Sequence, residues 1–220
     1  AKFAVGAAGA AGLLAALSPQ FVMAQQVKPD DARLHAVRRQ FASPQGHGTA
    51  QGYLVRPVDA KGPLPTVLVV HENRGLNPHV EDVARRLALE GYIVFAPDAL
   101  FPLGGYPGDE DKARAEFAKL DQEKTRQDFL AAAQWLRDIP GGNGRLGVVG
   151  FCFGGGMSNA LAVRMGSDLA AAVPFYGGQP AVADVPKIKA PILLHYAGLD
   201  TRINGGWPAY EEALKANKIP

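Results

Sequence analysis

The fold of this chain is indicated by the sequence Gly147-Val148-Val149-Gly150-Phe151-Cys152-Phe153-Gly154-Gly155-Gly156. A short apolar run, residues 146–151, leads into it, and a helix-compatible run, residues 157–165, leads out. A strand, a sharp turn with a Gly-x-Cys-x-Gly core, and then a helix make up the layout of a nucleophile elbow. The glycines are required because a side chain beside the turn would collide with the strand or with the helix packed on it. Cys152 is therefore the candidate nucleophile, placed where a helix N-terminus favours a thiolate and a developing oxyanion.

Composition limits the classes of protein to consider. The chain has 220 residues, of which 47% are hydrophobic and 20% charged, as expected for one α/β domain with a sizeable core. A net charge of +2 gives no reason to expect a nucleic-acid partner. The single cysteine excludes an internal disulfide, and the sequence shows neither a metal-ligand cluster nor a Walker pattern, so no cofactor or metal is expected. A lone cysteine can also be a buried structural residue, which is the alternative for Cys152.

The first 24 residues differ from the rest of the chain. Lys2 precedes an uncharged run rich in Ala, Gly and Leu at 4–17, and Val22-Met23-Ala24 resembles a small-residue cleavage site. This plan predicts an export signal and a periplasmic location; the alternative is an N-terminal helix on a cytoplasmic protein. With a linker after it, the signal-like segment spans residues 1–31, and the folded domain spans residues 32–220.

Strands and helices alternate along the domain. Extended segments at 34–41 and 51–58, with turn residues between them, predict a hairpin. The pattern then predicts strands at 66–70, 92–96, 146–151, 169–176 and 190–196, and helices at 78–90, 111–137, 157–165 and 207–217. Such alternation predicts a mostly parallel, doubly wound sheet with helices on both faces.

Two carboxylates follow predicted strands and are candidates for the site. Loops at the carboxyl ends of parallel strands collect functional residues, and Asp200 and the segment 71–75 both occupy such loops. Asp200 can orient an imidazole or can simply cap a turn or helix. Glu72 can accept the proton of Cys152, and the backbone of its loop can offer an N–H to an oxyanion; alternatively, this loop is only solvated.

These segments together resemble the dienelactone hydrolase family. The resemblance runs from about residue 46 to residue 216 and rests on the cysteine elbow, His71-Glu72-Asn73-Arg74-Gly75-Leu76-Asn77, residues 82–88, Gly91-Tyr92 and Ala96-Pro97-Asp98. It implies an α/β-hydrolase fold and a Cys-His-Asp triad acting on an ester or lactone.

The resemblance also implies roles for individual residues. Cys152 would be the nucleophile, Asp200 the triad acid and Glu72 the carboxylate that controls thiol ionisation. The N–H of Phe153 and one from the Glu72–Asn73 turn would form the oxyanion hole. Family substrates carry a carboxylate held by arginines, for which Arg74 and Arg202 are the candidates here.

The triad histidine has no counterpart in the expected place. The five histidines are His35, His47, His71, His79 and His195, and none follows Asp200. We expect the last strand and helix of the fold, with this histidine, to be lacking from the chain. The predicted strand 190–196 would then be an unprotected edge, so that low stability or self-association is expected. His71 is an alternative base, whereas His195 is expected to pack.

Three functions remain open from the sequence. The first is a hydrolase of small esters or lactones that works through a thioester on Cys152. The second is a catalytically inactive remnant or interaction module that keeps the fold without the base. The third is a glutaminase-like cysteine elbow, which does not explain an acid at the position of Asp200.

Overall fold

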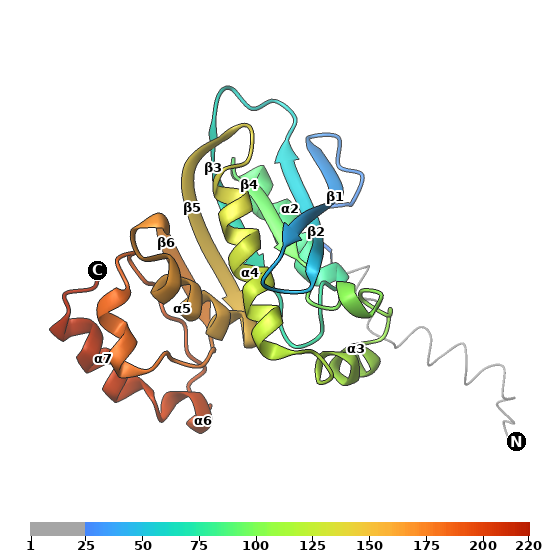
Figure 1. The fold of residues 1–220 in the computed structure, drawn as a ribbon. Helices are drawn as coiled ribbons and strands as arrows, with labels where there is room; N and C mark the ends of the chain where they lie inside the picture. The colour runs from blue at the N-terminus through green and yellow to red at the C-terminus, as the bar shows by residue number, and fades with distance from the viewer. Residues whose placement is uncertain (1–24) are drawn as a thin grey trace, which may run out of the picture.

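The computed structural model describes residues 25–220, so the predicted export signal lies outside the described residues. Its centre is a six-stranded sheet in the order β1-β2-β4-β3-β5-β6 (Figure 1). β1 pairs with β2 and β2 with β4 in antiparallel fashion, and the pairs β4–β3, β3–β5 and β5–β6 are parallel. The strands are β1 (Leu34–Ser43), β2 (Gly48–Pro57), β3 (Leu64–Val70), β4 (Ile93–Pro97), β5 (Gly142–Phe151) and β6 (Ala171–Phe175). The predicted hairpin and the mostly parallel arrangement are confirmed.

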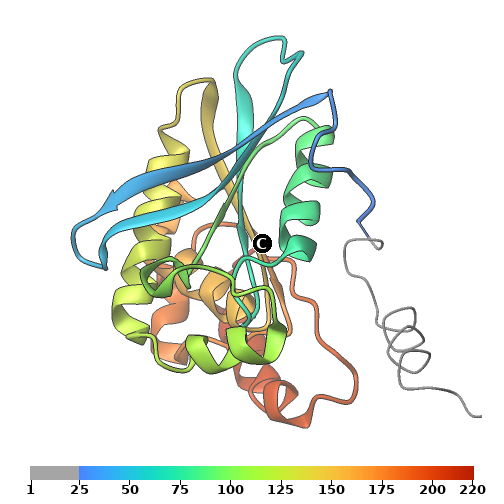
Figure 2. The same ribbon diagram turned by 90° about the vertical axis from the view of Figure 1, so that its right-hand side faces the viewer.

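Helices cover both faces of the sheet, which makes three layers (Figure 2). Helix α2 (Pro78–Leu89) packs Val80, Ala84 and Ala88 on one face. Helices α4 (Gln122–Arg137) and α5 (Phe153–Met165) cover the other face, where their apolar side chains meet residues of β3, β4 and β5. Because side chains alternate along a strand, each central strand supplies both cores. None of the helices within residues 25–220 is long and apolar enough to cross a membrane.

The predicted helical stretch 111–137 is divided in two. Helix α3 (Glu110–Phe117) ends before Asp121, whose carboxylate accepts hydrogen bonds from the N–H groups of Glu123 and Lys124 at 3.0 Å and starts α4. An aspartate at this position satisfies N–H groups that have no partner in the helix, so it begins a new helix. The short 3-10 helices η2 (Phe101–Leu103), η3 (Gly166–Asp168) and η4 (Val182–Lys187) complete the connections before the C-terminal region.

The segment 190–196 is not the regular strand that the sequence predicts. It pairs with β6 only through two isolated parallel bridges, Ala172 to Ile192 and Phe175 to His195. The N–H of Leu193 donates to Ala172, and the N–H of His195 donates to Pro174, both at 3.0 Å. Pro174 has no N–H to return to this segment, so the ladder is interrupted in its middle.

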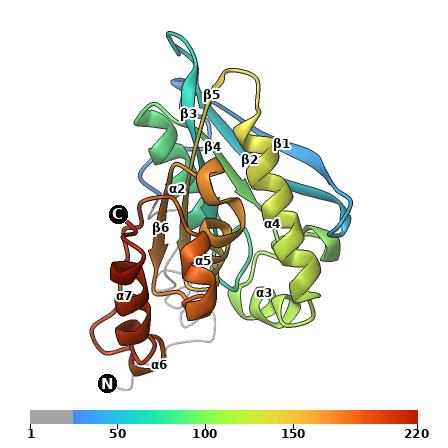
Figure 3. The same cartoon turned by 60° about the vertical axis from the view of Figure 1, so that its left-hand side comes forward.

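The C-terminal helices gather near α5 on the β6 side of the sheet (Figure 3). They are α6 (Thr201–Asn204) and α7 (Trp207–Ala216), the latter as predicted. The buried hydroxyl of Tyr210 in α7 donates to Asn159 in α5 at 3.1 Å. The loop after β6 lies against the N-terminal end of α5, where a Cβ on Gly155 would stand 2.9 Å from the Cα of Gly177.

Candidate active site

Cys152 lies at the turn between β5 and α5, in a backbone conformation that L-residues rarely adopt. Its φ is 54° and its ψ is −109°, and its N–H donates to the carbonyl of Phe175 at 3.0 Å. A Cβ on Gly150 would stand 2.0 Å from the carbonyl oxygen of Gly154, and a Cβ on Gly154 would stand 2.2 Å from that of Val70. Only glycine fits these two positions, so the predicted elbow is present in its strained form.

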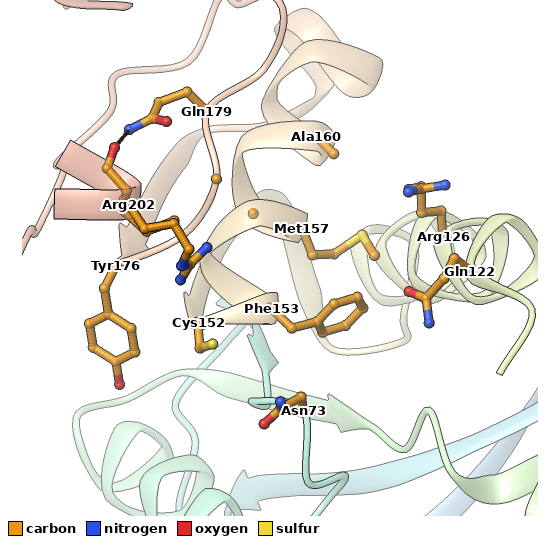
Figure 4. A pocket seen from close by; sticks show the side chains of 13 residues that line it. Asn73, Gln122, Arg126, Cys152, Phe153, Met157, Ala160, Tyr176, Gln179 and Arg202 are labelled. Carbon is orange, nitrogen blue, oxygen red and sulfur yellow. Dashed lines mark hydrogen bonds between the residues drawn. The ribbon is translucent and has the colours of Figure 1, made fainter. Parts of the chain in front are cut away.

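The thiol opens into a cavity of about 510 Å³ (Figure 4). The cavity lies among the end of β6, the N-terminus of α5, α4 and α6. Its lining combines one thiol with amide, phenol and guanidinium groups: Asn73, Gln122, Arg126, Cys152, Phe153, Gly156, Met157, Ala160, Tyr176, Gly178, Gln179, Arg202 and Ile203. This volume and polarity suit a small polar molecule.

Both predicted oxyanion residues, Phe153 and Asn73, line this cavity beside Cys152. Phe153 is the first residue of α5, and no side chain within residues 25–220 caps that helix end. Its ring is fixed in an aromatic cluster, 4.8 Å from Phe117 and 5.9 Å from Phe129 between ring centroids. The helix N-terminus therefore presents its N–H groups in a well-packed setting, as an oxyanion site requires.

The carboxylate of Glu72 is hydrogen-bonded to a tyrosine of the cavity that was not among the predicted site residues. The hydroxyl of Tyr176 donates to Oε1 of Glu72 at 3.1 Å, and both side chains are half-buried. Tyr176 lines the cavity, whereas Glu72 is not among the lining residues. Tyr176 directly follows β6, so the rule that singled out Glu72, a position at the carboxyl end of a parallel strand, also applied to this tyrosine.

His71 does not have the geometry of an alternative base. It is fully buried, its Nδ1–H donates to the carbonyl of Glu72, and its Nε2 accepts from the N–H of Ala99 at 3.1 Å. Burial holds the pKa of His71 below its usual value, so the ring is neutral. With both nitrogens occupied, His71 fixes the loop that carries Glu72 and has no nitrogen free for a proton from Cys152. None of the five histidines lines the cavity.

Asp200 lies at the N-terminus of α6, outside the cavity lining. Its Oδ1 accepts a hydrogen bond from the N–H of Ile203 at 3.0 Å, so Asp200 caps this short helix. Helix capping is the alternative role that the sequence left open for Asp200. Arg202, by contrast, lines the cavity, 3.9 Å from the carboxylate of Asp200. The role of Asp200 as a triad acid stays a prediction.

The arginines of the site differ from the pair named by sequence. Arg74 is 3.1 Å from the carboxylate of Glu110 and does not line the cavity. Arg126, on α4, does line it, as its position opposite Cys152 in Figure 4 shows. Arg126 sits in a surface ion pair with Glu123 at 3.0 Å, and no local motif marked it beforehand. Within residues 25–220, no group of three or more His, Cys, Asp or Glu side chains could hold a metal ion.

The chain is similar in sequence to known proteins. A family model described as the dienelactone hydrolase family matches residues 50–220. A protein of Escherichia coli O157:H7, named provisionally as a carboxymethylenebutenolidase, is 35% identical over 191 residues, which is 80% of this chain and 68% of that protein. A fragment from E. coli (strain K12), YghX, provisionally assigned as a hydrolase, is 51% identical over 105 residues, 48% of this chain and 90% of the fragment.

The chain is also similar to a protein of known crystal structure. That protein is a provisionally assigned dienelactone hydrolase from Klebsiella pneumoniae subsp. pneumoniae MGH 78578. It matches with a TM-score of 0.69 at 30% identity, covering 84% of this chain and 82% of that one. The α/β-hydrolase fold predicted from the sequence is confirmed by this neighbour.

Proposed function

Since the chain belongs to the dienelactone hydrolase family, we propose that it hydrolyses small esters or lactones with Cys152 as the nucleophile. One observation carries this proposal: the strained elbow presents the only thiol of the chain to a cavity of about 510 Å³ that Phe153 and Asn73 also line. A cysteine kept in an unfavourable backbone conformation at a cavity is better explained by chemistry than by packing.

The proposed reaction has two halves. In the first, the proton of the Cys152 thiol passes to Glu72 while the sulfur forms a bond to the substrate carbonyl carbon. The N–H groups of Phe153 and Asn73 stabilise the oxyanion, the bond to the leaving oxygen breaks, and that oxygen takes the proton from Glu72. In the second half, water adds to the thioester, which yields the carboxylic acid and restores the thiol.

The cavity favours substrates with a negative charge. Arg126 and Arg202 approach it from α4 and α6, and the amides of Gln122 and Gln179 lie beside them. The guanidinium groups can pair with a carboxylate or similar group on the substrate. We therefore include an anionic substituent in the substrate class and carry Arg202 and Arg126 forward for this role, but not Arg74.

Steady-state hydrolysis by the Cys152→Ala and Cys152→Ser variants tests the proposal. With 4-nitrophenyl acetate and a simple aryl lactone as substrates, we expect turnover to fall at least about a hundredfold in both variants. Mass spectrometry of the quenched wild type should show an acyl group on Cys152. The exposed Ser167→Ala serves as the matched control and should behave as wild type. Equal turnover in wild type and Cys152→Ala, or no turnover in either, would contradict the assignment.

We also propose that the chain self-associates through the 190–196 edge. Leu193 is 59% exposed there. Beside this edge, the uncovered sheet face near α2 forms an apolar groove of about 430 Å³ that includes Phe151, Val173 and Phe175. Sedimentation velocity over a range of concentrations should show a dimer that Leu193→Lys weakens. The control Val58→Lys changes a residue that is 57% exposed at the end of β2 and should leave the dimer intact. A wild-type monomer at all concentrations would refute this proposal.

A further inference from the structure

The contact between Tyr176 and Glu72 joins two loops that are 104 residues apart in the chain. Tyr176 lies beside Cys152 in the cavity (Figure 4), and its hydroxyl holds one oxygen of the Glu72 carboxylate. Within residues 25–220, Glu72 forms no ion pair with a Lys, Arg or His side chain. Its carboxylate accepts its side-chain hydrogen bond from the phenol of Tyr176. A hydrogen bond to a charged acceptor is about twice as strong as a neutral one.

The backbone that carries the phenol is held firmly in place. Tyr176 has a φ of 39°, and its N–H donates to the carbonyl of His195 at 2.8 Å. The next residue, Gly177, is pressed against α5, where a Cβ would stand 2.1 Å from the backbone of Gly155. A non-glycine residue held at positive φ stores strain, and such residues collect at functional sites. Tyr176 and Cys152 are the two cavity residues in this state.

The phenol remains a donor at every pH at which the site can work. Burial, then the charge of Glu72 and the hydrogen bond to it, and then the charge of Cys152 raise the pKa of Tyr176 to about 12. The other charged groups that face Cys152 are Arg126 from α4 and Arg202 from α6. His71 turns its nitrogens to backbone groups and stays neutral. Of these groups, the donor to Glu72 is Tyr176.

We propose that Tyr176 is a positioning residue that holds the Glu72 carboxylate in place for its task as the acceptor of the Cys152 proton. The inference rests on the proposed function, because it assigns this task to Glu72. The hydrogen bond from the phenol fixes one oxygen of the carboxylate, so loss of the phenol should slow proton transfer from Cys152.

Thiol exchange measured against pH tests this role without any ester turnover. Dipyridyl disulfide reacts with Cys152, whose sulfur bonds to one sulfur of the probe and releases pyridinethione, which is followed by absorbance. We expect the wild type to keep a plateau of reactivity on the acidic side, which Glu72→Gln removes. In Tyr176→Phe, the reactivity on this plateau should fall about tenfold, because the Glu72 carboxylate loses the donor that holds it in place.

The double variant and a control separate positioning from packing. In the Glu72→Gln background, Tyr176→Phe should not lower the reactivity further. Tyr92→Phe, a half-buried tyrosine outside this cavity, should keep the wild-type profile. The inference is overturned if Tyr176→Phe lowers the rate equally in the wild type and in the Glu72→Gln background, or if Glu72→Gln keeps the plateau. Failure of the proposed hydrolase would instead appear as turnover that survives loss of Cys152.

Discussion

Replacing Cys152 with glycine should leave the fold more stable than replacing it with alanine. Both variants lose the thiol, but only alanine keeps a Cβ at a φ of 54° and a ψ of −109°. A residue held in such a conformation costs about 1–3 kcal/mol. Glycine is free of this strain but loses about 0.5–1 kcal/mol through the greater freedom of the unfolded chain. The difference favours the glycine variant by about 1 kcal/mol, which for a chain of this size raises Tm by about 2–4 °C.

Urea unfolding of the two variants, followed by circular dichroism, measures this difference. The thiol probe should fail to react with either variant, since the chain has a single cysteine. Ala181→Gly is the matched control, because Ala181 has an ordinary φ of −58°, and there glycine should cost about 0.4–1 kcal/mol. If Cys152→Gly unfolds at the same or a lower urea concentration than Cys152→Ala, the elbow is not strained and the reasoning fails.

Three further predictions concern the residues around the elbow. Gly154→Ala should destabilise the fold by about 3 kcal/mol, because the added Cβ would stand 2.2 Å from the carbonyl oxygen of Val70. The control Gly178→Ala, which has open space at its Cβ, should change the midpoint of urea unfolding little. Similar midpoints for the two variants would contradict this prediction. Burial lowers the pKa of His71 in the folded chain. As the pH drops below about 6.5, this histidine is therefore protonated in the unfolded chain first, and the free energy of unfolding decreases. His71→Gln should show a smaller loss between pH 7 and pH 5 in urea titrations, and an equal loss would refute this account. Asp200→Ala should lose about 1 kcal/mol as the cap of α6 is removed, while Asp200→Asn keeps an acceptor oxygen and most of the stability; equal losses in thermal melts would count against capping.

Much of the fold could be predicted because its signals are local. The β-branched run in β3, the helical spacing of Val80, Ala84 and Ala88, and the glycines around Cys152 each act within a few residues. The failures arose where a distant residue decided the outcome. The segment 190–196 has a strand-like sequence, but Pro174 in β6 cannot supply the N–H that a regular ladder needs.

The elbow and its candidate nucleophile could thus be predicted from the sequence alone, since the glycine spacing and the change from strand to helix are local features. Only the tertiary structure decided the surroundings of the thiol. It placed Tyr176 against Glu72, occupied both nitrogens of His71 and turned Asp200 to cap α6. A hydrogen-bond partner depends on where the chain path brings a side chain, and for Tyr176 and Glu72 that path is 104 residues long. No local pattern carries information over such a distance, which is why the candidate nucleophile was evident and its supporting contacts were not.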